Sequence, residues 1–123
     1  VFFTRQVTPM SITQFKNTAS LQLDESNPVA VPIGEPVAMA STTSVERDDG
    51  VETGVWECTP GRWRRQITAQ EFCHFISGRC TFTPDGGGET LHIQGGDALM
   101  LPANTLGIWD IQETVRKSYV LIF

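Results

Sequence analysis

Residues 71–78 read Glu-Phe-Cys-His-Phe-Ile-Ser-Gly, and residues 96–102 read Gly-Asp-Ala-Leu-Met-Leu-Pro. Six residues separate Glu71 from Gly78 in the first stretch, and five separate Gly96 from Pro102 in the second. Between them, residues 84–88 read Pro-Asp-Gly-Gly-Gly, which is a strong turn signal because glycine accepts the positive φ angles of tight hairpin loops. The two stretches therefore predict strands that are connected through a hairpin.

Short β-prone segments recur along most of the chain and are separated by Gly, Pro, Asn and Asp. We predict strands at residues 55–59, 62–67, 71–77, 79–83, 89–94, 98–101 and 115–123. Regularly spaced short strands with frequent turns are typical of a β-sandwich or a barrel. With 123 residues, 40% of them apolar and 19% charged, the chain is expected to form one all-β structural domain.

The first 45 or so residues have a different pattern. Pro28, Pro32 and Pro36 recur at every fourth position, which excludes a helix and disfavours a central strand. We therefore expect residues 1–45 to form an extended arm with one or two edge strands, and residues 46–123 to form the barrel. Residues 11–18 could instead form one helical turn, with Ser11 as a weak cap.

Two further stretches complete a family resemblance. Residues 56–63 read Trp-Glu-Cys-Thr-Pro-Gly-Arg-Trp, and residues 115–119 read Val-Arg-Lys-Ser-Tyr. Together with the two spacings above, they resemble the cupin superfamily, in the branch that contains the cupin domain of (S)-ureidoglycine aminohydrolase and the EutQ-type proteins. The resemblance covers about residues 52–123 and implies a cupin jelly-roll barrel, also called a double-stranded β-helix.

In most cupins these motifs frame a metal that is held by three histidines and one glutamate, and Glu71 matches the glutamate. The resemblance would place the His-x-His pair at Arg64 and Gln66, or at Arg65 and Ile67, and the last histidine at Gly107. Arginine cannot serve as a ligand because its guanidinium keeps its proton. A carboxylate and an amide without imidazole make a poor site for zinc, iron or manganese, so we expect no metal cofactor.

Strand alternation predicts which residues face the barrel interior, because residues of one parity share a face. If Glu71 points inward, Cys73 and Phe75 do as well, and His74 points outward. In the following hairpin the inner face is expected to carry Cys80, Phe82, Leu91 and Ile93, which leaves His92 outside. Neither histidine is then available to a metal in the barrel.

The same alternation places Arg64 and Gln66 beside Glu71 on the inner face. Trp109, Tyr119 and Lys117, which shares the parity of Tyr119, are predicted to complete a small-molecule pocket. Arg64 would bind a carboxylate or ureido oxygen, because its planar fork matches two acceptors. Glu71 would have a raised pKa in a partly dry cavity and act as a general acid or base.

Each assignment has a structural alternative. Arg64 and Glu71 could form a buried ion pair, and the tryptophans could serve as core packing. Cys73 and Cys80 are expected to fill space rather than act as nucleophiles. Asp97 follows a glycine at a turn, where it would bond its own backbone. The other two arginines of the basic cluster, Arg62 and Arg65, are expected to reach solvent or a partner subunit.

Composition narrows the possible partners. The net charge of −5 argues against nucleic acid, and no apolar run approaches the roughly 20 residues of a membrane-spanning helix. Three cysteines without a CxxC spacing and the lack of a leader at Val1–Arg5 suggest a cytoplasmic protein.

Three functions remain open. The first is metal-free binding or turnover of a small carboxylate-bearing or ureido-type metabolite. The second is a metal-dependent hydrolase of the ureidoglycine aminohydrolase type, which the resemblance implies. The third is a non-catalytic homodimeric module, because residues 119–123 are bulky on both faces, as expected of a strand that meets another sheet or subunit.

Overall fold

The computed structural model describes residues 6–8 and 11–123. In this part of the chain ten strands form one curled sheet. The strands are β1 (Gln6–Thr8), β2 (Asn27–Pro28), β3 (Pro32–Ile33), β4 (Met39–Arg47), β5 (Val51–Cys58), β6 (Gly61–Arg65), β7 (Gln70–Pro84), β8 (Leu91–Gln94), β9 (Ala98–Leu101) and β10 (Gly107–Ile122). The fold is the expected cupin jelly roll. None of the described residues belongs to a helix that could cross a membrane.

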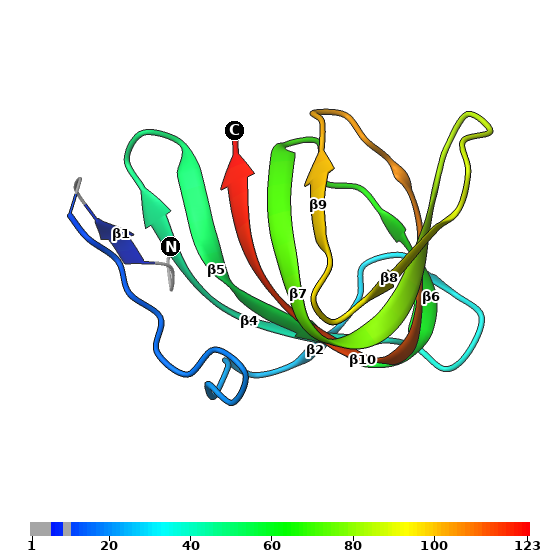
Figure 1. The fold of residues 1–123 in the computed structure, drawn as a ribbon, viewed down its shortest axis with the longest axis horizontal. Coiled ribbons are helices and arrows are strands. Elements are labelled where there is room, and N and C mark those ends of the chain that lie inside the picture. Colours follow the sequence, from blue (N-terminus) through cyan, green and yellow to red (C-terminus); the bar gives the residue numbers. More distant parts are fainter. Residues whose placement is uncertain (1–5, 9–10) are drawn as a thin grey trace.

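Two long strands hold the barrel together. β7 and β10 are antiparallel over most of their length and bend around the barrel, as Figure 1 shows. One half of β10 also pairs with β5 and the other half with β6, whereas β7 pairs with β8 and β9. Because β7 and β10 bend, each of them runs along both sides of the barrel and contributes side chains to both sides of its interior.

Gly78 lies where β7 and β10 bend and their pairing register shifts. Its φ is +91°, a region that other residues rarely adopt, and an added Cβ would collide with the backbone of Thr114 on β10. The glycine of the Glu-x6-Gly spacing is thus required by the fold. Gly86 and Gly87, with φ of +89° and +85°, form the predicted turn after β7.

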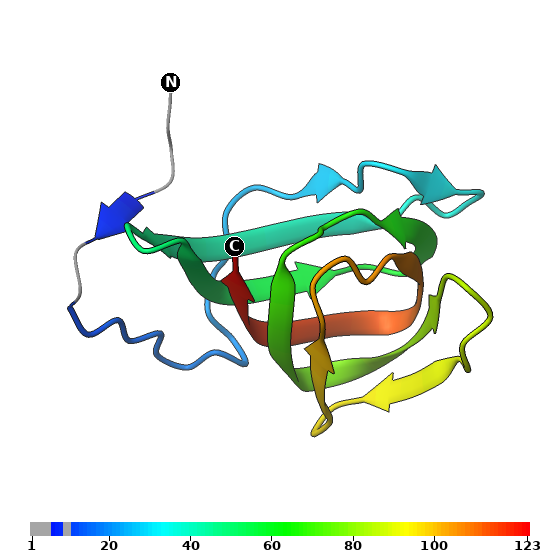
Figure 2. The same cartoon turned by 90° about the horizontal axis from the view of Figure 1, so that it is seen from above.

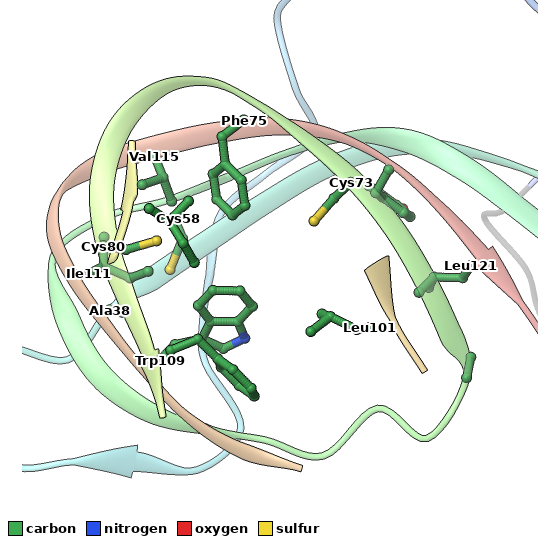
Figure 3. Close-up of a cluster of buried hydrophobic side chains, with 14 residues drawn as sticks. Ala38, Cys58, Cys73, Phe75, Cys80, Leu101, Trp109, Ile111, Val115 and Leu121 are labelled. Atoms are coloured by element: carbon green, nitrogen blue, oxygen red, sulfur yellow. The ribbon is translucent and has the colours of Figure 1, made fainter. Parts of the chain in front are cut away.

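Alternation along β7 packs the barrel core as predicted. Cys73, Phe75, Cys80 and Phe82 are all buried, and the indole of Trp109 projects into the middle of the cluster in Figure 3. Ile93 is buried as well, and His74 and His92 are exposed as expected. Leu91 is the cross-strand partner of the buried Phe82 and so lies on the predicted face, but at the start of the short strand β8 it is 41% exposed.

The N-terminal segment follows the outside of the barrel (Figure 2). β2 pairs with β4 and β3 pairs with β6, so two short strands lie in the proline-rich region. Residues 11–18 contain no helical turn; a turn at residues 17–20 is closed by the Ser20 N–H, which donates to the Asn17 carbonyl at 2.9 Å. β4 pairs with β5 along the barrel sheet, so the arm ends before Met39.

Candidate functional site

A cavity of about 180 Å³ lies at one end of the barrel interior. Its polar lining is formed by Thr42, Glu52, Arg65, Glu71, Lys117 and Tyr119. Its apolar lining is formed by Trp56, Trp63, Ile67, Trp109 and Leu121. All three tryptophans of the chain therefore contribute to the wall.

Glu71 is at the centre of a buried ionic triad. Its Oε1 accepts a hydrogen bond from Arg65 Nη2 at 2.9 Å, and its Oε2 lies 2.8 Å from Lys117 Nζ. The side chains of Arg65, Glu71 and Lys117 are 1%, 3% and 7% exposed. Both carboxylate oxygens are thus engaged by cations that belong to the chain.

The expectation that Glu71 has a raised pKa is wrong. Burial raises the pKa of this carboxyl, but the adjacent Lys117 ammonium and Arg65 guanidinium together outweigh it, and the net shift is below the ordinary value of 4.5. Glu71 is therefore ionised at neutral pH. A carboxylate of this kind is a poor proton donor, and each of its oxygens already contacts a cation.

Arg65 takes the inner position that was predicted for Arg64. Its Nη1 donates to the carbonyls of Ile67 at 2.7 Å and Thr105 at 2.6 Å, which fixes the loop between β6 and β7 and the loop before β10. The earlier assignment of Arg65 to solvent or a partner subunit is also wrong, since only 1% of its side chain is exposed.

Arg64 and Gln66 do not line the cavity, which corrects the predicted site. Arg64 Nη2 pairs with Asp85 at 2.6 Å on the surface, and Gln66 is exposed. Counting back by twos from Glu71 leads to Ile67, Arg65 and Trp63, which do line the cavity, whereas Arg64 and Gln66 have the opposite parity. The predicted pair was therefore one residue out of register, and a shift of one residue exchanges the two faces of a strand. The strand pairing identifies the inner face. Trp63 on β6 is the cross-strand partner of Trp109 on β10, so Trp63 and Arg65 share the inner face with Trp109.

Lys117 lies in an aromatic cage. Its Nζ is 4.5 Å from the ring centroid of Trp56, 5.2 Å from that of Trp109 and 5.7 Å from that of Phe75. Among the described residues its ionic partner is Glu71. The ammonium has three N–H donors, so this contact leaves donor capacity beside the cavity. Lys117 was among the residues predicted to line the pocket, and it lies in the cavity wall beside Glu71.

A second polar group lies farther along the wall. The Tyr119 hydroxyl donates to Glu52 Oε2 at 2.7 Å and lies 3.3 Å from Thr42 Oγ1. Burial raises the pKa of Tyr119, so the phenol stays protonated. Tyr119 was predicted here and Glu52 was missed. The alternation Glu52-x-Gly54-x-Trp56-x-Cys58 was a signal that could have located it.

The aromatic wall is continuous. Ring centroids are 6.1 Å apart for Trp56 and Trp63, 6.4 Å for Trp63 and Trp109, and 4.7 Å for Phe82 and Trp109. Trp109 belongs to the hydrophobic core and also lines the cavity, so both roles considered for it, core packing and pocket wall, apply. Asp97 is structural as expected, because its carboxylate accepts a hydrogen bond from the Gln94 backbone at 2.9 Å.

The profile of the EutQ-like cupin domain matches residues 45–119 of the chain. The chain belongs to the EutQ-like cupin domain family. Among curated proteins none matches this EutQ-like cupin in sequence. The matched region therefore includes the ionic triad of Arg65, Glu71 and Lys117, and also Glu52 and Tyr119.

Solved structures give the same fold. EutQ from Clostridium difficile superposes with a TM-score of 0.70 at 16% identity, over 86% of this chain and 83% of that one. A DUF861 protein of unknown function from Pseudomonas syringae gives 0.70 at 20% identity, over 85% of this chain and 46% of the other. A DUF861 protein from Thermotoga maritima gives 0.53 at 26% identity, over 55% and 76%. These likenesses show the fold alone.

The residues present do not fit the metal that is usual in cupins. The possible histidine positions of the first motif on the inner side are taken by Arg65, which cannot ligate, and Ile67. At Gly107 a Cβ would lie 2.4 Å from the Thr83 carbonyl oxygen and 2.7 Å from the Phe82 ring, so no side chain fits. Within residues 6–8 and 11–123, no three His, Cys, Asp or Glu side chains converge on a possible metal position.

Proposed function

We propose that this EutQ-like cupin binds a small polar metabolite in the barrel cavity through Lys117. The observation that carries the proposal is an ammonium with spare donors, held by Glu71 at 2.8 Å beside an aromatic cavity. Such concave apolar sites with a few convergent polar groups are the usual places for small ligands.

The size and charge of the cavity define the class of ligand. A volume of about 180 Å³ is below the roughly 300–1,000 Å³ of drug-sized sites, so the ligand is a small metabolite. Lys117 offers donors at one side, and the hydrogen-bonded pair of Tyr119 and Glu52 makes the other side polar and acidic. A molecule with an acceptor at one end and an N–H donor at the other, such as a ureide, an amide or an amino acid, meets both requirements.

In this proposal Glu71 is a positioning residue rather than an acid or base. It holds the ammonium with one oxygen while Arg65 fixes the other, so Lys117 presents its remaining donors in a defined direction. Trp109 and Tyr119 form walls of the cavity, and stacking on the tryptophans supplies the apolar contact. Conversion of the bound molecule would need a water or co-substrate beside Lys117.

Thermal shift with ureides, short amides, amino acids and short carboxylates tests the proposal. A ligand at about one hundred times its Kd stabilises by about 2.7 kcal/mol, which is readily measured. We expect wild type and Arg64→Ala to respond alike, and Lys117→Met and Tyr119→Phe to lose the response. If none of these compounds stabilises wild type at millimolar concentration, the proposal fails. A ligand response that is lost in Arg64→Ala would instead support the site predicted from the sequence, in which Arg64 binds the ligand.

The metal-dependent hydrolase of the ureidoglycine aminohydrolase type is the alternative function. The mismatched ligand set counts against it. Elemental analysis of untagged protein purified without chelator distinguishes the two. One equivalent of manganese, iron, zinc or nickel per chain would revive the hydrolase.

A second proposal concerns assembly and rests on an apolar patch formed by Phe72, Met100 and Ile122, which are 46%, 53% and 42% exposed. Phe72 and Met100 are cross-strand partners on β7 and β9, and Ile122 lies on the adjoining strand β10. A chain with net charge −5 repels its own copies, so contact is favoured at an uncharged patch such as this one. We propose that a second copy covers it in a two-fold dimer.

Light scattering at tens of micromolar tests the dimer. We expect twice the chain mass for wild type and a monomer for Phe72→Glu, with Gln66→Glu at an exposed loop residue as the charge-matched control outside the patch. A monomeric wild type contradicts the proposal.

The three buried free thiols of the described chain are compatible with a reducing compartment, and we retain a cytoplasmic location as a proposal.

A further inference from the structure

The carboxylate of Glu71 needs a cation, and the cavity contains one. An ionised carboxylate that is 3% exposed is costly unless it is paired. Arg65 meets part of this need, but its Nη1 is occupied by the carbonyls of Ile67 and Thr105. The Oε2 atom faces Lys117 Nζ at 2.8 Å. In most cupins the matching glutamate would face a metal.

The cage around the ammonium is built by strand pairing. Lys117 on β10 is the cross-strand partner of Trp56 on β5 and of Phe75 on β7. Trp109 comes from the other half of β10, and its ring centroid lies 5.2 Å from Nζ. Three aromatic rings therefore surround the ammonium of Lys117 on β10. Aromatic faces attract an ammonium, whereas a divalent metal requires lone-pair donors.

We propose that the chain supplies its own cation: the Lys117 ammonium takes the place of the cupin metal, bound by Glu71 and the aromatic cage of Trp56, Phe75 and Trp109. The proposal does not depend on any ligand of the cavity. It is an ammonium site that the chain fills with its own side chain. The positive charge in the barrel then belongs to the chain itself and is insensitive to chelators.

Chemical rescue tests the proposal. Lys117→Ala removes Cγ, Cδ, Cε and Nζ, and n-propylammonium reproduces those four atoms. We expect Lys117→Ala to melt below wild type, and n-propylammonium at about ten times its Kd to raise the Tm of that variant by about 4 °C. 1-Propanol controls for shape without charge, and Lys117→Met controls for a filled, neutral cage.

The outcomes separate cleanly. Selective rescue of Lys117→Ala by n-propylammonium supports a cation site. Equal shifts in wild type, Lys117→Ala and Lys117→Met, or equal rescue by 1-propanol, overturn it, because the lysine would then only fill space.

Should Lys117→Ala not fold, the wild type decides the question. After dialysis against manganese, zinc or nickel we expect far less than one equivalent per chain. Stoichiometric binding that is lost in Glu71→Gln would place a metal at Glu71 and overturn the proposal. Since neither experiment uses a metabolite, their failure is distinct from failure of the ligand screen.

Discussion

Arg65 Nη2 and Glu71 Oε1 lie 2.9 Å apart, with side chains that are 1% and 3% exposed, whereas the neighbouring Arg64 reaches the surface and pairs with Asp85. Two consecutive arginines thus have opposite environments. The buried pair connects the end of β6 to the start of β7, and Arg65 also binds the loop before β10. The stability of this end of the barrel should depend on one arginine and not on the other.

Arg65→Ala and Arg64→Ala form a matched pair of substitutions. Removal of Arg65 leaves one oxygen of Glu71 and two carbonyls without their partner, and we expect a loss of about 3–5 kcal/mol in the free energy of unfolding. Removal of Arg64 breaks an exposed pair, and we expect a loss of at most about 1 kcal/mol. Urea unfolding of both variants measures the difference; equal losses would contradict the assignment.

The depressed pKa of Glu71 predicts a specific pH dependence of stability. A carboxyl whose pKa is lower in the folded than in the unfolded state contributes stability that is complete above the unfolded value, here 4.5, and is lost as the pH falls through the folded value. We expect the stability gap between wild type and Glu71→Gln to be largest above about pH 5 and to shrink toward pH 3. Urea titrations across this range measure it. A gap that widens in acid would mean that the pKa is raised.

The three thiols should be inert in the folded protein. Burial raises the pKa of Cys58 and Cys80 to about 12 and that of Cys73 to about 11, and all three side chains are buried. Because the thiolate is the reactive form, we expect no fast reaction with a thiol reagent at pH 8 and three equivalents after denaturation. Fast reaction of one thiol in the native state would indicate an open or mobile core.

Position 107 should not accept the histidine that most cupins would have there. A Cβ at Gly107 meets the Thr83 carbonyl oxygen and the Phe82 ring, so we expect Gly107→Ala to lose about 1–3 kcal/mol and Gly107→His to lose more. Gln66→Ala, at an exposed loop residue, is the control and should change stability by less than about 0.5 kcal/mol. A stable Gly107→His variant would show that the strand can move aside.

Much of the fold could be predicted from local patterns. The spacings around Glu71 and Gly78 and around Gly96 and Pro102 indicated the jelly roll, and period-two alternation along β7 placed Cys73 and Phe75 inside and His74 outside. These predictions hold because residues within one continuous strand alternate strictly between faces. Leu91 lies on the predicted face opposite Phe82 but is 41% exposed, because it is at the end of a strand of only four residues.

The candidate site was predicted only in part. Glu71, Trp109, Lys117 and Tyr119 line the cavity, whereas Arg64 and Gln66 do not. Alternation counted from Glu71 leads to Arg65 and not to Arg64, so the predicted pair was one residue out of register, and such a shift moves side chains to the opposite face. The pKa shift of Glu71 is opposite to the prediction, because two buried cations contact the carboxylate and outweigh the effect of burial.

The sequence by itself determined the strands, the glycine turns and the absence of histidines at the cupin metal positions, because these depend on residue type and on spacing within one strand. Only the tertiary structure decided that Arg65 and Lys117 share Glu71, and that Trp56, Phe75 and Trp109 surround the lysine. Those contacts join the consecutive strands β5, β6 and β7 to the distant strand β10. Their geometry is set by pairing register and by barrel closure, and neither of these is a property of a local segment.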